Sequence, residues 1–271
     1  MAMSINTNVG AMIALQNLNR SNSELEKTQL HITTGLKVNG PKDDASTYAI
    51  AQRMRGDIAG MHAVKTALAA GESTLNVAIT AGKAISDMLT EMKAKTVQAN
   101  QAGLDTASKD ALQQDFTSLR DQLTTIVQTA EFNGKNLITA GATDLEVLST
   151  IEGSTITVAA QSLDPTTLLI HTATLATANS ASQARLILDT AITSVANSLA
   201  SLGSVSKRVD IQAAFTGKLM DIMKQGVGNL VDADLAEESA NLQAIQIKQQ
   251  LGVQALSIAN SGPQSILALF G

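Results

Sequence analysis

Hydrophobic residues recur at helical spacing over three long stretches of the chain, and polar residues fill the positions between them. In the longest stretch, residues 188–227, the apolar positions lie four or three residues apart, and only Ser206 and Thr216 interrupt them. The same spacing runs through residues 54–79 and 112–130. A narrow apolar stripe of this length is typical of helices that pack as coiled coils. We therefore predict a mainly α fold, an elongated rod of long coiled-coil-like helices.

Turn-forming residues divide these helices from one another. Asn39-Gly40-Pro41 is strong turn chemistry and predicts a loop over residues 35–44. Residues 100–108 separate the second and third helical stretches. Asn133 and Gly134 follow the third stretch, and we expect them to close that helix, with the glycine in a left-handed cap.

A segment rich in Thr and Ser, residues 137–182, has a different pattern. Residues 144–150 and 155–160 alternate in polarity and carry β-branched side chains. This alternation predicts a small β-hairpin that turns at Glu152-Gly153. We expect residues 166–177 to face solvent and to tolerate substitution.

Both ends of the chain predict weaker helices, with incomplete apolar stripes and few charged residues. Such helices are marginal in isolation, and we expect neighbouring copies to complete them. A charge at Val9 or Leu242 should therefore block assembly more than folding. The candidate self-association residues are Ile5, Val9, Met12, Leu15, Leu18, Leu235, Leu242, Ile245, Leu251, Leu256, Ile266 and Leu267.

Composition supports a protein whose surface is covered by other chains. Charged residues make up 16% of the sequence, against about 25% in a typical soluble domain, although 44% are hydrophobic. A net charge of −5 gives no basic surface, so we expect no nucleic-acid partner. The sequence has no cysteine, which excludes disulfides and thiolate chemistry.

Membrane insertion and a cleaved secretory signal are also not expected. No uninterrupted apolar run approaches the roughly 18–20 residues that span a bilayer. The first charged residue is Arg20, so the basic start of a signal peptide is missing. We expect the protein either to stay in the cytoplasm or to leave by a route without a cleaved signal.

The clearest candidates for chemistry are two acidic pairs, Asp43 with Asp44 and Asp232 with Asp234. Carboxylates could ligate a hard cation. The alternative, which we favour, is that they cap the helices that follow. The three histidines are far apart in the sequence, without the spacing of a zinc motif. No nucleophile or phosphate-binding motif occurs, so we predict no enzyme activity, no cofactor and no metal.

Several motifs, in the same order along the chain, resemble bacterial flagellin, and the short length resembles the compact flagellins of alphaproteobacteria. The resemblance covers roughly residues 1–137 and 185–271. The motifs are residues 5–8 (Ile-Asn-Thr-Asn), 34–39 (Thr-Gly-Leu-Lys-Val-Asn), 42–45 (Lys-Asp-Asp-Ala), 49–51 (Ala-Ile-Ala), 54–56 (Met-Arg-Gly), 131–137 (Glu-Phe-Asn-Gly-Lys-Asn-Leu), 231–239 (Val-Asp-Ala-Asp-Leu-Ala-Glu-Glu-Ser), 249–250 (Gln-Gln), 259–260 (Ala-Asn) and 263–267 (Pro-Gln-Ser-Ile-Leu).

The resemblance implies a structural subunit that self-polymerises into the flagellar filament used for swimming. Paired terminal helices, residues 1–44 and 235–271, would form the inner tube of the filament. Residues 45–136 and 183–234 would form a helical rod, and residues 137–182 a small outer β-region.

The resemblance also implies partners and a location. The partners would be copies of the chain, alone or mixed with other flagellins, together with the flagellar type III export apparatus, an export chaperone, and hook-associated and cap proteins. The protein would be extracellular, in the filament, after export without a cleaved signal peptide.

Recognition by the Toll-like receptor that senses flagellin is a further implication of the resemblance. In strongly detected relatives the contact surface centres on an Arg and a Leu in one helix and a Glu in the next. The matching positions here are Glu91, Lys95 and Asp115. Only Asp115 keeps the charge, so we expect weak activation or none.

Two other functions remain open from the sequence. A hook–filament junction protein shares flagellin-like ends, although it usually carries less complete flagellin motifs in the rod. A secreted coiled-coil scaffold outside the flagellum would fit the apolar stripes, but not the low charge or the ordered motifs.

Overall fold

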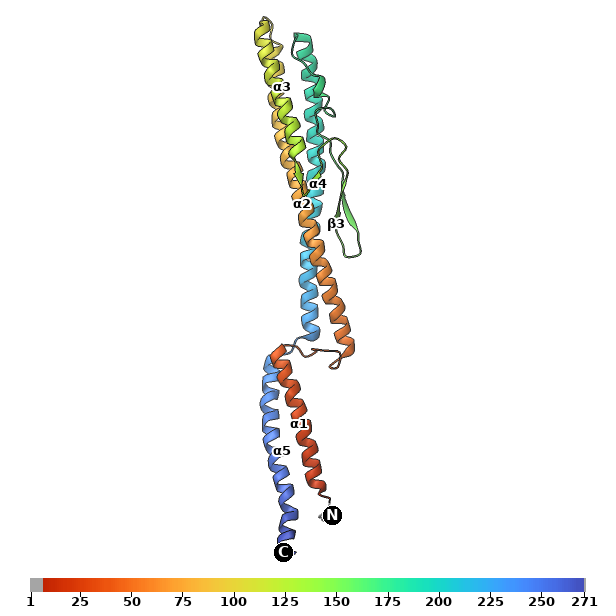
Figure 1. The fold of residues 1–271 in the computed structure, drawn as a ribbon, viewed down its shortest axis with the longest axis vertical. Helices are drawn as coiled ribbons and strands as arrows, with labels where there is room; N and C mark the ends of the chain where they lie inside the picture. The colour runs from red at the N-terminus through yellow and green to blue at the C-terminus, as the bar shows by residue number, and fades with distance from the viewer. Residues whose placement is uncertain (1–6, 271) are drawn as a thin grey trace. The chain divides into compact units, whose positions relative to one another are not determined.

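A computed structural model describes residues 7–270, with side chains up to residue 261. Ile5, Ile266 and Leu267, three of the self-association candidates, lie outside the described side chains. The mainly helical prediction is confirmed. The long helices are α1 (Val9–Thr34), α2 (Ala45–Ala99), α3 (Thr106–Thr129), α4 (Ala178–Val231) and α5 (Leu235–Phe270) (Figure 1).

The chain divides into two compact units. The terminal unit is Met1–Gly56 together with Ile222–Gly271, and the central unit is Asp57–Asp221. The division falls inside α2 and α4, whereas the sequence analysis placed its boundaries near the loops. Contacts of the loop explain the difference, because the backbone N–H of Lys37 donates to Val231 O at 2.8 Å and Val38 is buried.

Side-chain caps account for where several helices begin. Asn8 Oδ1 accepts from the N–H of Ala11 at 3.0 Å at the start of α1. At the start of α3, Asp105 Oδ1 accepts from the N–H of Ser108. These bonds satisfy amides that have no partner inside a helix. Helix α1 ends at Gly35, whose φ of 71° is left-handed, so glycine is the residue that fits there.

A continuous apolar core holds the central unit together. The stripes predicted from the sequence supply it: Leu68 and Leu75 from α2, Phe116 from α3, and Leu188 and Val195 from α4 are fully buried. Ion pairs link the same helices, with Lys93 of α2 to Asp189 of α4 at 2.5 Å and Lys95 of α2 to Asp115 of α3 at 2.7 Å. The core therefore runs between three helices.

Two short hairpins lie between α3 and α4. Strands β1 (Glu131–Phe132) and β2 (Lys135–Asn136) pair around Asn133 and Gly134, which both have positive φ. The prediction that these two residues cap α3 is wrong. The helix ends at Thr129, and the Asn-Gly pair forms the two-residue turn that its left-handed backbone suits.

The second hairpin is the one that the sequence predicted. Strand β3 (Leu145–Leu148) pairs antiparallel with β4 (Thr155–Val158), and Gly153 lies in the turn with a φ of 94°. Its inner side packs on α2 where the helix has Gly71. A Cβ added there would lie 2.5 Å from Cγ2 of Val147, so the hairpin approaches the helix backbone at a distance that only glycine permits.

Residues 166–177 are not the solvent-facing segment that we expected. Leu168, Ile170, Ala173 and Leu175 are buried in the central core, around a short 3₁₀ turn, η1 (Ile170–Thr172). Two bonds attach the segment to α3: Gln113 Oε1 accepts from the N–H of Leu175, and Arg120 donates to His171 O. The many threonines of this segment favoured exposure in the sequence analysis, but the apolar residues between them are buried.

Candidate self-association surface

Helices α1 and α5 pair antiparallel within the terminal unit (Figure 1). The face of α5 that meets α1 is recognised by its burial: Ile245 is 7% exposed, and Leu242, Gln249, Gly252 and Leu256 are half-buried. We had assigned Leu242, Ile245 and Leu256 to a stripe that neighbouring copies complete. The structure places them against α1 of the same chain instead.

Three polar contacts run along this pairing. Asn8 Nδ2 donates to Ala259 O at 2.8 Å, and Gln249 Nε2 donates to Asn22 Oδ1 at 2.9 Å. At the other end, His31 Nδ1 lies 2.7 Å from Glu238 Oε1, and both side chains are largely buried. We call these contacts the polar ladder. No sequence pattern indicated them, because the partners are more than 200 residues apart in the chain.

The opposite face of α5 carries a second apolar stripe, which the sequence analysis missed. Its residues follow one another by steps of four and three, so they lie on one side of the helix. All are exposed, and Ile258 is 73% exposed. We call this set the outer stripe: Ala236, Ala240, Ala244, Ile247, Leu251, Ala255 and Ile258. Only Leu251 is among the residues that the sequence predicted, because four of the seven residues on this face are alanines of low hydrophobicity.

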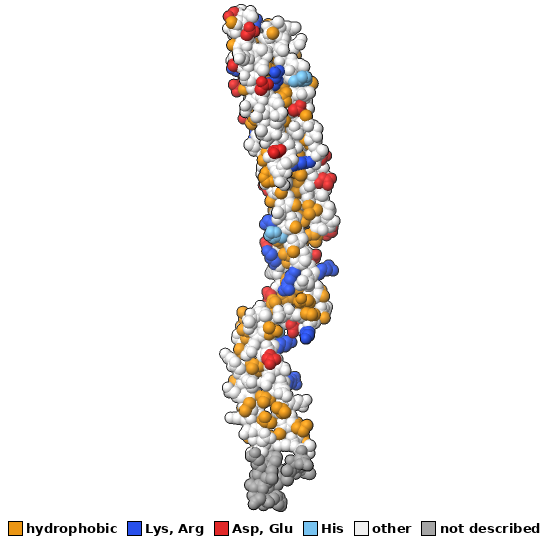
Figure 2. Space-filling view, in the orientation of Figure 1, with side chains coloured by type: hydrophobic (Ala, Val, Ile, Leu, Met, Phe, Trp, Pro, Cys, Tyr) orange, Lys and Arg blue, Asp and Glu red, His pale blue; other side chains and the backbone are white. Residues whose placement is uncertain are grey.

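Helix α1 exposes apolar side chains mainly near its start. Val9 and Met12 are 60% and 63% exposed, and Leu15 is 48% exposed, as the sequence analysis had expected of an unpaired stripe. Leu18 is half-buried and lies next to Gly252 of α5. Figure 2 shows hydrophobic side chains gathered on the visible surface of the terminal helices.

Three of the four acidic residues, Asp43, Asp44 and Asp234, accept hydrogen bonds from backbone N–H groups. Asp44 accepts from the N–H groups of Ser46 and Thr47 at the start of α2, and the bond from the Thr47 hydroxyl is the main cause that lowers the pKa of Asp44. Asp234 accepts from the N–H groups that begin α5. Asp43 Oδ2 instead accepts from the N–H groups of Asn39 and Gly40 in the preceding loop.

Asp232 and Leu235 lie at the connection between α4 and α5. Asp232 forms a single antiparallel bridge with Leu36, which joins that connection to the loop after α1. Its position directly after α4 therefore differs from the helix start that we had expected. Leu235 begins α5 and is 51% exposed.

The residues that match the receptor surface lie on α2 and α3 of the central unit. Glu91 is exposed. The hydrogen bond from Lys95 Nζ to Asp115 Oδ2 raises the pKa of Lys95, and the charges of Asp115 and Glu91 act in the same direction. Asp115 is thus already paired with Lys95 inside the chain.

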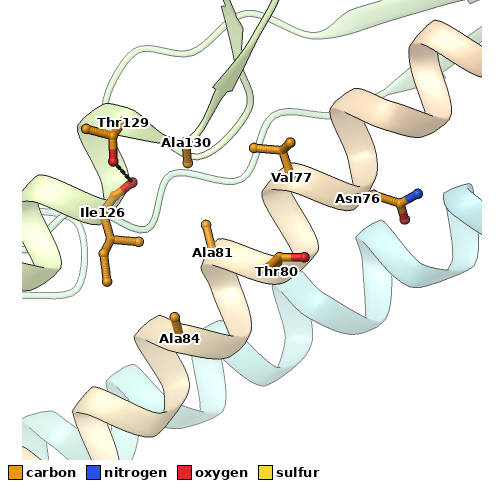
Figure 3. Close-up of a pocket in the computed structure, with 8 residues that line it drawn as sticks. All are labelled: Asn76, Val77, Thr80, Ala81, Ala84, Ile126, Thr129 and Ala130. Carbon is orange, nitrogen blue, oxygen red and sulfur yellow. Dashed lines mark hydrogen bonds between the residues drawn. The ribbon is translucent and has the colours of Figure 1, made fainter.

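An apolar groove opens between α2 and α3 in the central unit (Figure 3). It measures about 470 Å³ and is lined mainly by small and apolar side chains, among them Val77, Ala81, Ala84 and Ile126. The polar lining is limited to Asn76, Thr80 and Thr129, and the Thr129 hydroxyl is hydrogen-bonded to Ile126 O. None of these side chains titrates near neutral pH, so the lining offers no general acid or base.

Among the residues that the structure describes, no three His, Asp or Glu side chains cluster as a metal site would require. One helix, α4, contains an 18-residue window with a mean hydropathy of 1.3, enough to span a membrane by length and composition alone. The window is not an uninterrupted apolar run, because polar residues stand between its apolar ones. The absence of membrane insertion stays a prediction.

Comparison with known proteins identifies the kind of protein that this helical arrangement belongs to. Residues 5–143 match the bacterial flagellin N-terminal helical region, and residues 185–270 match the C-terminal helical region. Flagellin FljM of Caulobacter vibrioides is 48% identical over 98% of both chains. A flagellin of Brucella melitensis is 38% identical over 98% of this chain and 99% of its own.

Solved structures give the same architecture. A crystal structure of Bacillus cereus flagellin aligns with a TM-score of 0.50 and 26% identity, over 54% of this chain and 86% of that one. A putative flagellar hook-associated protein from Vibrio parahaemolyticus aligns with a TM-score of 0.59 over 70% of this chain and 100% of its own. At 12% identity, that second likeness concerns the fold alone.

These matches define a structural, filament-forming class of protein. The chain belongs to the bacterial flagellin family. It is a subunit of the flagellar filament, of the short alphaproteobacterial type, and nothing in the comparisons favours the hook–filament junction alternative.

Proposed function

We propose that the outer stripe of α5, with the exposed start of α1, is the surface through which copies of this chain polymerise. The observation that carries the proposal is a helix with two apolar faces, of which α1 covers one. Copies of the same chain are the partner that fits, because flagellins self-assemble into filaments. A contact between two different surfaces of one chain need not close on itself, and repetition then gives a helical filament.

The chemistry of the outer stripe suits helix packing between copies. Its four alanines allow a second helix to approach closely, while Ile247, Leu251 and Ile258 supply apolar area. Burial of such area contributes about 25 cal/mol per Å². Between Ser239 and Ser261 the only charged residue is Lys248, so little charge must be desolvated.

Charge on the outer stripe tests the proposal. The double substitution Ile247→Asp and Leu251→Asp should abolish salt-induced polymerisation, since an unpaired buried carboxylate costs several kcal/mol in each subunit. Both side chains are more than half exposed, so circular dichroism and thermal unfolding of the dissociated subunit should not change.

A matched control separates position from charge. Gln246→Asp with Gln250→Asp adds the same two charges at exposed positions beside the stripe and should still form filaments in electron micrographs. Normal filaments from the double variant would exclude the outer stripe as the polymerisation surface.

We also propose that the chain is secreted through the flagellar type III apparatus without a cleaved signal peptide, with help from an export chaperone. Hook-associated and cap proteins would then contact the two ends of the extracellular filament. Family membership supports this proposal. Mass spectrometry of filament protein should find the encoded N-terminus, and a shortened one would contradict export without cleavage.

A weak response of the Toll-like receptor is a separate proposal. It is supported by the acidic Glu91 and the cationic Lys95 at positions where strongly detected relatives have Arg and Leu. Reporter cells given dissociated subunits should respond weakly, and Glu91→Arg with Lys95→Leu should raise the response. A strong response from the unchanged protein would refute this proposal.

A further inference from the structure

We propose that the polar ladder selects which face of α5 packs against α1, and thereby keeps the outer stripe free. Helix α5 offers α1 two apolar faces, and apolar contact alone discriminates poorly between them. The inference concerns pairing within one chain, so it stands or falls independently of what covers the outer stripe.

The two faces are similar in apolar content. Successive residues turn about 100° around a helix, which places Leu242, Ile245 and Leu256 on the side opposite Ile247 and Leu251. The outer stripe is continuous and has no polar member. The inner face is interrupted by Gln249 and Gly252. Hydrophobicity therefore gives no reason for α1 to prefer the inner face.

Hydrogen bonding distinguishes the faces. Asn22 and His31 lie on the side of α1 that meets α5, and their partners Gln249 and Glu238 lie on the inner face. On the outer stripe these two side chains would meet alanine, isoleucine and leucine. A buried polar group without a partner costs about 1–3 kcal/mol, which is enough to decide between otherwise similar packings.

The inner face already leaves one polar atom without a bond. Nε2 of His31 is buried and has no hydrogen-bond partner among the described atoms. The imidazole thus relies on its Nδ1 contact with Glu238, and a packing that removed Glu238 would leave both ring nitrogens without a bond. Polar side chains at helix interfaces are known to fix register and partner choice in coiled coils in this way.

Cysteine pairs can report the chosen face, because the chain has no cysteine of its own. A Cβ added at Gly252 would lie 3.8 Å from Cβ of Leu18, within the 3.5–4.5 Å typical of disulfides. Leu18→Cys with Gly252→Cys therefore reports the inner face. Leu18→Cys with Leu251→Cys reports the outer face at the same level of the helix.

The experiment oxidises dissociated, dilute subunits and separates intramolecular from intermolecular cross-links on non-reducing gels. With the ladder intact, the inner-face pair should cross-link and the outer-face pair should not. In a background of Asn22→Leu, Gln249→Leu, His31→Leu and Glu238→Leu, the ratio of outer-face to inner-face product should rise by at least about tenfold. The milder background Asn22→Leu with Gln249→Leu should give a smaller rise and serves if the fourfold variant does not fold.

Exposed positions supply the matched control. Gln16→Leu with Gln246→Leu adds apolar area to the same helices and leaves the ladder intact, so it should keep the inner-face preference. An unchanged ratio in both of the backgrounds that lack ladder contacts would overturn the proposal. So would an equal rise in the control, or failure of the inner-face pair to cross-link in the unchanged background.

Discussion

The central and terminal units are built from helices with the same kind of apolar stripe, yet they bury their side chains very differently. In the central unit α2, α3 and α4 share one core, closed by the hairpin and residues 159–177. In the terminal unit, Ile245 is the one buried apolar side chain among those described on α1 and α5. Val9, Met12, Ile247 and Leu251 are more than half exposed. The central unit thus has an apolar core of its own, and the terminal helix pair does not.

The number of packed layers explains the contrast. Two paired helices can bury only the faces that they turn toward each other, so a helix with two apolar faces keeps one in water. Three helices and a hairpin surround a core from several sides. Exposed apolar surface of this extent marks an interaction site, and in a polymerising family it is expected on the unit that polymerises.

The largest effect on folding should come from the central core. Phe116 is fully buried in α3, and Phe116→Ala should lower the stability of the subunit by about 3–5 kcal/mol. Phe215→Ala is the matched control, because Phe215 is 57% exposed and its loss should cost within about 0.5 kcal/mol. Urea unfolding of dissociated subunits measures both, and equal losses would contradict the assigned core.

The segment before α4 should behave as core rather than as surface. Leu175→Ala removes a fully buried side chain and should cost about 2–4 kcal/mol. Thr174→Ala, at the exposed neighbouring position, should change little. If both variants were neutral in urea unfolding, our original expectation of a solvent-facing segment would be right after all.

Within the terminal unit, two isoleucines should separate folding from assembly. Ile245→Ala should weaken the α1–α5 pair by about 2 kcal/mol, because Ile245 is buried between the helices. Ile247→Ala should leave the dissociated subunit unchanged and raise the subunit concentration needed for polymerisation. Amide exchange in α1 and a sedimentation assay measure the two effects, and a reversed pattern would mean that the faces of α5 are misassigned.

A smaller effect should follow where the hairpin meets α2. Gly71→Ala gains about 1 kcal/mol of helix propensity but drives a methyl group into Val147, and such overpacking costs about 1–3 kcal/mol. The net result should be a loss of about 1 kcal/mol. Gly56→Ala is the control in the same helix, where an added Cβ meets nothing, and it should stabilise.

The smallest effect that we predict is on how the stability of the subunit falls at low pH. Burial acts to raise the pKa of Asp164, but hydrogen bonds from Thr167 and Thr166 outweigh it, so the pKa lies below its ordinary value. The resulting stability is present above the unfolded pKa of about 3.9 and is lost as the pH falls through the folded value.

The substitution Asp164→Asn should therefore lower the melting temperature near neutral pH slightly and flatten its decline in acid. Asp110→Asn, an exposed carboxylate of α3, should leave the decline as it is. If the two variants titrated alike in thermal unfolding, the bonds to Asp164 would carry no stability.

Periodicity predicted the long helices because each buries one apolar stripe. The turn residues Gly35 and Gly153 predicted the loop after the first helix and the turn of the β3–β4 hairpin. Local pattern failed where a partner distant in sequence decides the outcome. Asn133-Gly134 could equally end a helix or turn a hairpin, and Leu175 is buried only because α3 lies beside it. The residues of the outer stripe follow a four-and-three spacing in the sequence. Four of the seven are alanines, whose low hydrophobicity did not predict an apolar face.

We expect the terminal helices to carry assembly and the central unit to fold without them, and removal of residues 234–271 separates these two roles. The truncated chain should keep a cooperative thermal transition, which Phe116→Ala still lowers, and should sediment as a monomer under salt conditions in which the full chain forms filaments. Filaments of normal diameter from the truncated chain, or loss of its cooperative transition, would contradict the account.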